Sequence, residues 1–449
     1  MRSFLAAFCA YRLRQFAPVA VMIVCLGLPC FAGDKSGQLS SYEKAVMQQM
    51  LKDTADAVRK NYYDPSLHGV DFTAAYQVAD QEIRNATSVH QGYEAIESML
   101  AKLDDSHTHF IPPAQPFKVE QGWEMQMIGD KCLVTHITDG SDAAAQGLKA
   151  GDRILVVDGV KPSREGWAGL HYQLRTLSPR SSLHLVVGAP GEQPKNMVVA
   201  SKVIPRPAEY DLTTNDIWRL HELQQADWRQ KYEPRGVELD NVFVWKLPIF
   251  YLKEADVDSY FHKAQKYPAL VLDLRGNPGG AAAILLRVVG MVFDHDVKIA
   301  DDVKRDKTKA LVAKSQGDHA YKGKLIVLID SESASSSELF ARTVQLEKRG
   351  TVIGDQSAGA VRGAERFRVV HGDGMGNHYI FAVEVTVADV KMPDGKALEK
   401  NGVVPDENVL PSPEELAAGA DPQLARALQL AGSPTSAQKA GALFPPVKQ

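Results

Sequence analysis

Residues 327–363 read VLIDSESASSSELFARTVQLEKRGTVIGDQSAGAVRG, and the rest of the chain can be interpreted from this stretch. The apolar run at residues 324–329 predicts a buried strand, and helical spacing resumes at residues 338–344. Between them lie five serines. A strand, a tight serine-rich turn and a helix can lift a hydroxyl above a sheet, beside free N–H groups of the helix end. The alternative is helix capping, because Ser335 followed by Glu338 fits a capping box.

A second strand and turn precede this one. Residues 270–280 read LVLDLRGNPGG, and an apolar helix is expected over residues 281–292. Two such units predict an α/β core. The turn lacks the Lys-Ser/Thr of a P-loop and any GxGxxG pattern. Its glycines can instead point backbone N–H groups at an oxyanion. We therefore expect oxyanion donors at Gly279, Gly280 and Ser336.

The first 32 residues have the pattern of a secretory signal. Three arginines precede an apolar run at residues 16–28, which is too short for a comfortable membrane span. Residues 30–32, Cys-Phe-Ala, carry small residues at the positions that a signal peptidase reads, so we predict cleavage near Ala32. A lipoprotein acylated at Cys30 and a retained membrane anchor are the alternatives. The prediction is an exported protein, in the periplasm or cell envelope.

Composition describes an ordinary globular chain of two to four domains, with 449 residues, 45% of them apolar and 24% charged. Cleavage would remove Arg2, Arg12 and Arg14 and no acid, leaving 48 basic side chains against 55 acidic ones, a net charge of −7. This acidic balance, without a basic stripe, argues against a nucleic-acid partner. Cys132 would then be the single cysteine, which excludes an internal disulfide; its apolar surroundings predict a buried, inert thiol.

The remaining patterns divide the chain. Helical periodicity covers residues 40–103, short strands cover residues 118–205, and a polar connector with a helical stretch at 215–230 follows. Further strands are expected at 242–248, 367–370 and 379–387, with a hairpin turn at 372–377. Helices are expected at 254–266 and 421–431, and the last residues, 433–449, have the composition of a disordered tail.

The segment GLKAGDRILVVDG at residues 147–159 resembles the core hairpin of PDZ domains. The resemblance implies that an extended peptide could be added to a sheet edge. It places the peptide-binding loop at Gly122, Trp123, Glu124 and Met125. This loop has one glycine and one charge where a carboxylate-binding loop is usually apolar and glycine-rich. Recognition of a free C-terminus therefore stays open.

Six segments in order resemble the C-terminal-processing and tricorn-type serine peptidases: LDDSHTHF, GLKAGDRILVVDG, LVLDLRGNPGG, SASSSELFA, GTVIGDQSAGA and EKNGVVPD. The resemblance spans about residues 41–431. It implies an α/β multidomain protein with a crotonase/ClpP-like peptidase core. The expected parts are a signal peptide (1–32), an N-terminal helical domain (33–116), a PDZ domain (117–205), the peptidase core (206–412) and a C-terminal helix with a disordered tail (413–449).

The same resemblance implies the catalytic residues. The nucleophile is Ser335, with Ser337 and then Ser333 as alternatives if the alignment slips. One branch of the family uses a lysine at the position of Ala360, so that dyad is absent here. The tricorn-like branch uses a histidine, which matches His107. In that branch a serine, here Ser106, relays to a carboxylate, for which Glu399 is the candidate.

These residues agree with the chemistry of acyl transfer, because a serine hydroxyl needs a base and a third group must fix the imidazole. We expect no cofactor and no metal; His107 and His109 could share a face, but no third zinc ligand has suitable spacing. The predicted function is a serine endopeptidase acting on exported proteins or peptides. The alternative is a catalytically silent peptide- or ligand-binding protein on the same fold. The sequence does not indicate the oligomeric state or the substrate.

Overall fold

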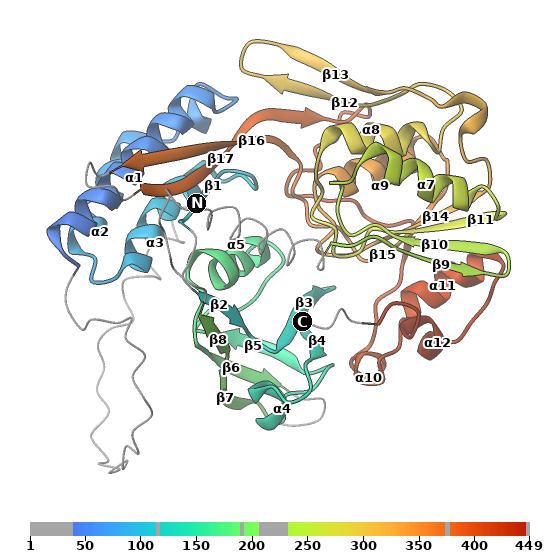
Figure 1. Ribbon diagram of the computed structural model, residues 1–449, viewed down its shortest axis with the longest axis horizontal. Helices are drawn as coiled ribbons and strands as arrows, with labels where there is room; N and C mark the ends of the chain where they lie inside the picture. Colours follow the sequence, from blue (N-terminus) through green and yellow to red (C-terminus); the bar gives the residue numbers. More distant parts are fainter. Residues whose placement is uncertain (1–38, 114–116, 189–192, 206–231, 373–377, 446–449) are drawn as a thin grey trace. The chain divides into compact units, whose positions relative to one another are not determined.

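The computed structural model describes residues 39–113, 117–188, 193–205, 232–372 and 378–445. A six-stranded sheet organises the C-terminal half in the order β18-β15-β14-β11-β10-β9 (Figure 1). All neighbouring pairs are parallel except β9 with β10. The strands are β9 (Arg235–Leu239), β10 (Val242–Lys246), β11 (Ala269–Asp273), β14 (Lys324–Ile329), β15 (Thr351–Gly354) and β18 (Glu407–Asn408). The sheet confirms the predicted α/β core.

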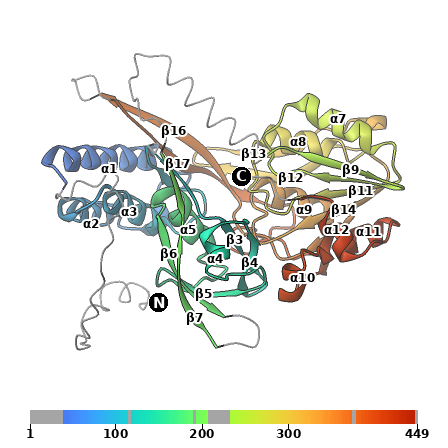
Figure 2. The same cartoon turned by 60° about the horizontal axis from the view of Figure 1, so that its bottom comes forward.

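Both faces of this sheet are buried, which explains why its central strands read as continuous apolar runs. In β14, Val327 faces one hydrophobic cluster and Ile326 and Leu328 face another. Helices α7 (Glu254–Ala264), α8 (Ala282–Gly290) and α9 (Ser336–Leu346) contribute to the first cluster, and α11 (Pro422–Ala431) contributes to the second. Figure 2 shows α7 and α8 on one side of the sheet and α11 on the other.

A second sheet has the order β1-β17-β12-β13, with β16 added on β17. Its strands are β1 (His109–Ile111), β12 (Val297–Lys304), β13 (Thr308–Ala313), β16 (Arg362–Gly372) and β17 (His378–Lys391). Strands β16 and β17 confirm the two predicted strands near residues 367 and 383, while the turn predicted between them lies largely outside the described residues. The pairing of β1 with β17 sets His109 opposite Glu384. This long-range pairing carries the segment before β1 to the C-terminal half.

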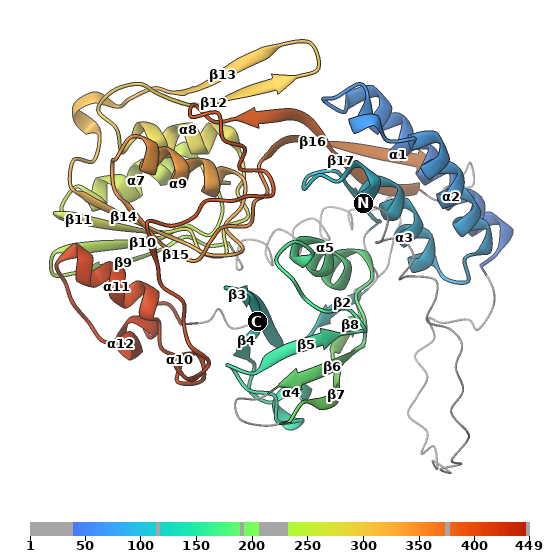
Figure 3. The same ribbon diagram turned by 180° about the vertical axis from the view of Figure 1, so that it is seen from behind.

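Three helices form the N-terminal part: α1 (Ser41–Asn61), α2 (Phe72–Asn85) and α3 (Val89–Leu100). Their apolar faces share one cluster with Phe381, Val383 and Val385 of β17. Figure 3 shows the β16–β17 hairpin running beside α1. The helical interpretation of residues 40–103 is confirmed, and the helices are packed directly on β17.

The strand-rich region contains a five-stranded antiparallel sheet in the order β3-β4-β5-β6-β7. Its strands are β3 (Trp123–Ile128), β4 (Lys131–Ile137), β5 (Arg153–Val157), β6 (Ser182–Gly188) and β7 (Lys195–Ala200), with helices α4 (Asp142–Ala145) and α5 (Trp167–Tyr172). Strands β2 (Phe117–Glu120) and β8 (Lys202–Pro205) pair with each other. In the sequence, β2 precedes the strands of this sheet and β8 follows them. Cys132 is buried, as predicted, and burial raises the pKa of its thiol to about 12.

The C-terminal segment differs from the expected disordered tail as far as Pro445. Helices α10 (Pro413–Ala417) and α12 (Ala437–Gly441) accompany α11, and Ala440 is buried in the cluster beneath the sheet. Leu443 and Phe444 pack against the same cluster, so apolar contacts order a segment whose composition suggested disorder. The predicted signal peptide and the helix expected at 215–230 lie outside the described residues. Within the described ranges, no helix is long and apolar enough to cross a membrane.

Candidate active site

Ser335 lies at the sharp turn between β14 and α9. Its backbone dihedral angles are φ 55° and ψ −115°, in a region that non-glycine residues rarely occupy. Such conformations cost on the order of 1–3 kcal/mol and occur preferentially at functional sites. The N–H of Ser335 donates to the Glu338 carboxylate at 3.0 Å, which is the return bond of a capping box. The turn therefore holds a strained serine at the N-terminus of α9.

The neighbouring serines have structural roles. Ser333 is fully buried and donates to the Leu274 carbonyl at 2.8 Å. Ser337 is also fully buried and donates to the Asn277 carbonyl at 3.0 Å. Ser335 is only half-buried, and among the described residues its hydroxyl donates a hydrogen bond to no group. The surroundings therefore favour Ser335 over both alternatives as the reactive serine.

Asn277 connects the glycine-rich turn to the serine turn. Its side-chain Nδ2 donates to the Leu247 carbonyl at 2.7 Å, and its Oδ1 accepts from the Gly279 N–H at 2.8 Å. Its own carbonyl accepts from the Ala334 N–H at 2.9 Å as well as from Ser337. The side chain is fully buried. Because a buried amide is costly unless it is paired, this network fixes the two turns relative to each other.

The two glycines predicted as oxyanion donors differ in their hydrogen bonds. The Gly279 N–H is already used by Asn277, whereas the N–H groups of Gly280 and Ser336 have no acceptor in the described part of the chain. Ser336 Oγ donates to the Gly280 carbonyl at 3.2 Å, which brings these two residues together. A Cβ on Gly279 would lie 2.6 Å from the Cβ of Ser335, so only glycine fits there. Two unpaired N–H groups on adjoining segments are what an oxyanion site requires.

Asp105 shapes the turn that carries the predicted base. Its carboxylate accepts from the backbone N–H groups of His107 and Thr108, both at 2.9 Å. The hydroxyls of Tyr62 and Thr386 donate to it at 2.6 and 3.0 Å. Burial opposes ionisation of Asp105, but these hydrogen bonds prevail and lower its pKa. The turn is thus held between the N-terminal helices and β17.

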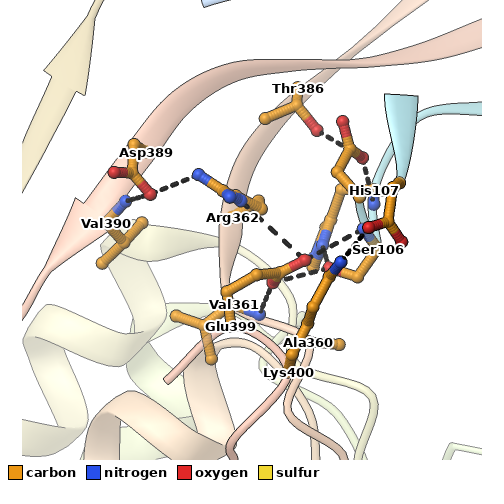
Figure 4. A network of polar contacts seen from close by, with 12 residues as sticks. Ser106, His107, Ala360, Val361, Arg362, Thr386, Asp389, Val390, Glu399 and Lys400 are labelled. Carbon is orange, nitrogen blue, oxygen red and sulfur yellow. Dashed lines mark hydrogen bonds and ion pairs between the residues drawn. The ribbon is translucent and has the colours of Figure 1, made fainter. Parts of the chain in front are cut away.

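Glu399 lies 293 residues from Ser106 in sequence and binds it twice (Figure 4). Ser106 Oγ donates to Glu399 Oε2 at 2.9 Å, and the Ser106 N–H donates to Oε1 at 3.1 Å. The Val361 N–H donates to Oε2 at 2.8 Å, and Arg362 Nε lies 3.8 Å from Oε1. These contacts hold the carboxylate as an acceptor facing Ser106.

His107 completes the chain, because its Nδ1 lies 2.7 Å from Ser106 Oγ. The Ser106 proton is directed to Glu399, so Ser106 Oγ must accept from Nδ1–H. This assigns the proton to Nδ1 and leaves the lone pair on Nε2, which has no partner among the described residues. Burial lowers the pKa of His107, although the Glu399 carboxylate acts in the opposite direction. The imidazole is therefore available as a neutral base near neutral pH.

His109 has a different environment from His107. Its Nδ1 lies 2.8 Å from Glu97 Oε1, and its Nε2 lies 3.1 Å from the Ser106 carbonyl. Burial works against the charged form, but the bond to Glu97 and the charge of that carboxylate raise the pKa of His109. Both ring nitrogens are occupied by protein groups, so His109 supports the turn and is not free to bind zinc. In the described ranges, no cluster of His, Cys, Asp and Glu suits a metal ion.

The structure does not join Ser335 directly to His107: no hydrogen bond links the two side chains among the described residues. It connects them through one peptide group. The Ala360 carbonyl accepts from the Ser335 N–H at 2.8 Å, and the N–H on the other side of the same peptide, that of Val361, donates to Glu399. Catalytic hydrogen bonds are often long before substrate binds. The predicted residues are thus gathered in one region, without a hydrogen bond between the predicted base and the predicted nucleophile.

The predicted peptide-binding residues lie at the start of β3, an edge strand that pairs with β4. Trp123 and Met125 are buried in the core of the domain, and Glu124 is half-exposed. Gly122 has φ 73° and leads into the strand. A peptide could add to this edge through backbone hydrogen bonds, but the side chains of Trp123 and Met125 face inward.

Sequence reasoning did not find the roles of Asn277, Asp105 and Thr386. The signal for Asn277 was its position directly before Pro-Gly-Gly, where a short amide can bond the turn's own N–H groups. Asp105 stands two residues before His107, the spacing of an Asx-type turn. Thr386 gave no signal, because its role depends on the pairing of β1 with β17.

A strained serine after a strand of an α/β sheet and a hydrogen-bonded Glu399–Ser106–His107 chain are features expected of a serine peptidase. Residues 244–409 match the sequence profile of peptidase family S41, and residues 117–188 match that of the PDZ domain. The chain thus contains a peptidase family S41 region, and a PDZ domain precedes it in the sequence.

Relatives and solved structures agree with this assignment. The chain is 26% identical over 438 residues to a carboxyl-terminal-processing protease of Synechocystis sp., covering 93% of this chain and 94% of that protein. It is also 26% identical over 336 residues to a carboxyl-terminal-processing protease of Picosynechococcus sp., covering 72% and 74%. The crystal structure of mature CPAF has a TM-score of 0.61 at 14% identity, covering 84% of this chain and 95% of that one. The last similarity concerns the fold alone.

Proposed function

We propose that this protein is a serine endopeptidase that cleaves exported proteins or peptides with Ser335 as nucleophile and His107 as base. In this proposal, Glu399 and Ser106 hold the imidazole in the tautomer that leaves Nε2 free. The observation that carries the proposal is the Glu399–Ser106–His107 chain, whose donors and acceptors allow only one proton order. The strained backbone of Ser335 also supports the proposal, as does its hydroxyl, which donates to no other described group.

The proposed reaction follows from these groups. Ser335 Oγ attacks the substrate carbonyl carbon while its proton passes to His107 Nε2. The oxyanion that forms accepts hydrogen bonds from the N–H groups of Gly280 and Ser336. His107 then returns the proton to the departing amine, leaving an ester on Ser335. A water molecule, activated by the same histidine, hydrolyses that ester and frees the serine.

The test compares Ser335→Ala and His107→Ala with the wild type on an unfolded protein substrate. A serine-directed fluorophosphonate is used in parallel to locate the reactive hydroxyl. We expect both variants to lose hydrolysis, and labelling to occur at Ser335 and disappear in Ser335→Ala. Ser436→Ala is the control, since it removes a serine hydroxyl that caps α12 and has no part in the proposed site. Wild-type hydrolysis by both Ser335→Ala and His107→Ala would exclude the assignment.

A catalytically silent binding protein is the competing function. A silent binding protein would keep the fold but would not react with the fluorophosphonate. The relatives named above are proteases. Absence of fluorophosphonate labelling in every oligomeric state would favour the silent protein. Labelling at Ser337 or Ser333 would move the nucleophile without changing the class.

We also propose export to the periplasm or cell envelope, with residues 1–32 as the signal. Relatives named carboxyl-terminal-processing and tail-specific proteases support this placement. The domain limits given above are proposed together with it. Fractionation of cells that produce the full chain, with N-terminal sequencing of the product, tests both: cleavage near Ala32 is expected, and a retained N-terminus would contradict it.

A further inference from the structure

Glu338 is a fully buried carboxylate that faces the back of the serine turn. Its Oε1 accepts from Ser357 Oγ at 2.6 Å and from the Gly359 N–H at 2.8 Å. Its Oε2 accepts from the N–H groups of Ala360 and Ser335, both at 3.0 Å. One side chain therefore binds the nucleophile's own backbone and three residues of the loop after β15, Ser357, Gly359 and Ala360.

The partners of Glu338 demand a carboxylate rather than a neutral acid. A carboxylate offers about four acceptor sites, and here four donors occupy them. Three of the donors are backbone N–H groups, which cannot accept a proton from Glu338. The fourth, Ser357 Oγ, already accepts from the Val403 N–H at 2.6 Å. Protonation of Glu338 would therefore reverse the bond to Ser357 Oγ and turn the serine proton away from the carboxyl group.

The loop that Glu338 binds is the one that reaches Glu399. The Ala360 N–H donates to Glu338, and the Ala360 carbonyl accepts from the Ser335 N–H. The next N–H, that of Val361, donates to Glu399. A shift of this loop would therefore move the nucleophile and the relay carboxylate at the same time.

We propose that Glu338 is a positioning residue: its ionised carboxylate fixes Ser335 relative to the Ala360–Val361 peptide. It thereby keeps the nucleophile correctly placed relative to the Glu399–Ser106–His107 chain. This inference rests on the proposed function. It assigns to Glu338 a role beyond helix capping, because a cap needs only the bond to the Ser335 N–H. The three bonds to residues 357–360 are what couple the two halves of the site.

The state of Glu338 can be followed by pH. Burial raises its pKa to about 7, against the hydrogen bonds that lower it. The charged groups on the elements around it are paired elsewhere: Arg342 with Asp394, Asp355 with Arg164, Lys400 with Asp104, Glu399 with Ser106, and Asp330 with the Gly276 N–H. Glu332, in the same turn, also has a partner of its own. An ionisation near neutral pH is thus expected to belong to Glu338, and that of His107 to lie lower.

The experiment compares Glu338→Gln with wild type by kcat, KM, thermal unfolding and the rate of fluorophosphonate labelling. Displacement by about an ångström typically costs on the order of 100-fold, so we expect kcat and labelling to fall about 10- to 100-fold with KM nearly unchanged. The step near pH 7 should also be missing from the kcat/KM profile. Glu415→Gln is the matched control, because Glu415 caps α10 with Ser412 in the same Ser-x-x-Glu geometry away from the site. It should leave kcat unchanged.

The outcomes separate this inference from the proposed function. Loss of activity in Ser335→Ala together with wild-type kcat and pH profile in folded Glu338→Gln would overturn the positioning role alone. An inactive, unlabelled wild type would overturn the proposed function itself. If Glu338→Gln does not fold, Ser357→Ala removes one loop donor to the same carboxylate. That variant should lower kcat several-fold at constant KM, and an unchanged kcat would also overturn the role.

Discussion

Ser335 and Glu399 bind opposite ends of a single peptide group. The Ser335 N–H donates to the Ala360 carbonyl at 2.8 Å, and the Val361 N–H of the same peptide donates to Glu399 Oε2 at 2.8 Å. A peptide group is planar and rigid. The proposed nucleophile, Ser335, and the proposed relay carboxylate, Glu399, are therefore held at a fixed separation by the backbone, although they come from different elements of the fold.

The first prediction concerns the relay. Glu399→Gln keeps the shape of the side chain but removes its charge and turns one acceptor oxygen into a donor. The Ser106 proton then loses its fixed direction, and the imidazolium loses its stabilising charge. We expect kcat to fall about 100- to 10,000-fold on a peptide substrate, as for the carboxylate of other triads. Glu407→Gln, whose carboxylate pairs with Arg426, is the control, and near-wild-type turnover by Glu399→Gln would disprove the relay.

The second prediction concerns Asn277. Asn277→Ala leaves the Leu247 carbonyl and the Gly279 N–H without partners in a buried region. Each unsatisfied group costs about 1–3 kcal/mol, so the free energy of unfolding should fall by about 2–4 kcal/mol in denaturant titration. Asn241→Ala, at an exposed position, should change it by less than about 0.5 kcal/mol. Equal stability of the two variants would show that Asn277 does not join the turns.

The third prediction concerns Arg275, which begins the glycine-rich turn. Its guanidinium binds Asp273 and Asp421 with two bonds each. Burial works against ionisation of Asp273, but the charges of Arg275 and Lys246 hold its pKa well below its usual range. Asp421→Asn removes one charge, while asparagine caps α11 as well as aspartate does. We expect a loss of about 2–4 kcal/mol in unfolding free energy and lower turnover.

An exposed ion pair provides the comparison for Asp421→Asn. Asp318 pairs with Lys322 at the surface, where such pairs contribute about 0–1 kcal/mol. Asp318→Asn should therefore leave stability and turnover almost unchanged. If Asp421→Asn behaves like Asp318→Asn, the C-terminal helix does not secure the turn.

The fourth prediction uses the raised pKa of Glu338 and the dependence of stability on pH. The pKa rises from 4.5 to about 7 because burial disfavours the charge. The folded state therefore binds this proton more tightly than the unfolded state. The resulting stabilisation is complete below about pH 4.5 and is lost as pH rises through about 7. Its full size is about 3 kcal/mol, at 1.36 kcal/mol per pKa unit.

Glu338→Gln has no such proton, so the comparison isolates Glu338 from the other titrating groups. The unfolding free energy of wild type relative to Glu338→Gln should fall by up to about 3 kcal/mol between about pH 4.5 and 7.5. Urea titrations at several pH values measure it. A difference that is constant or that rises with pH would contradict the raised pKa. Ionisation of Glu338, which the positioning role requires, would thus lower the free energy of unfolding.

Much of the architecture could be predicted from local patterns. The apolar runs of β11 and β14 predicted buried strands, because both faces of their sheet are covered. The alternation in β16 and β17 predicted a hairpin, because every second residue of such strands, here Phe381, Val383 and Val385, faces a hydrophobic cluster. The C-terminal tail was predicted wrongly up to Pro445, since its order depends on Leu443 and Phe444 meeting a cluster formed by distant strands.

The sequence by itself determined the resemblance to a peptidase family, most strands and helices, and the short group of residues in which the site is to be sought. Periodicity, turn chemistry and ordered motifs are local properties, so they can be read along the chain. Only the tertiary structure decided which hydroxyls and N–H groups are already satisfied, separating Ser335 from Ser333 and Gly280 from Gly279. It also brought Ser106 to Glu399 across 293 residues through the pairing of β1 with β17. Hydrogen-bond satisfaction and burial depend on what packs nearby, and that is settled only when the chain has folded.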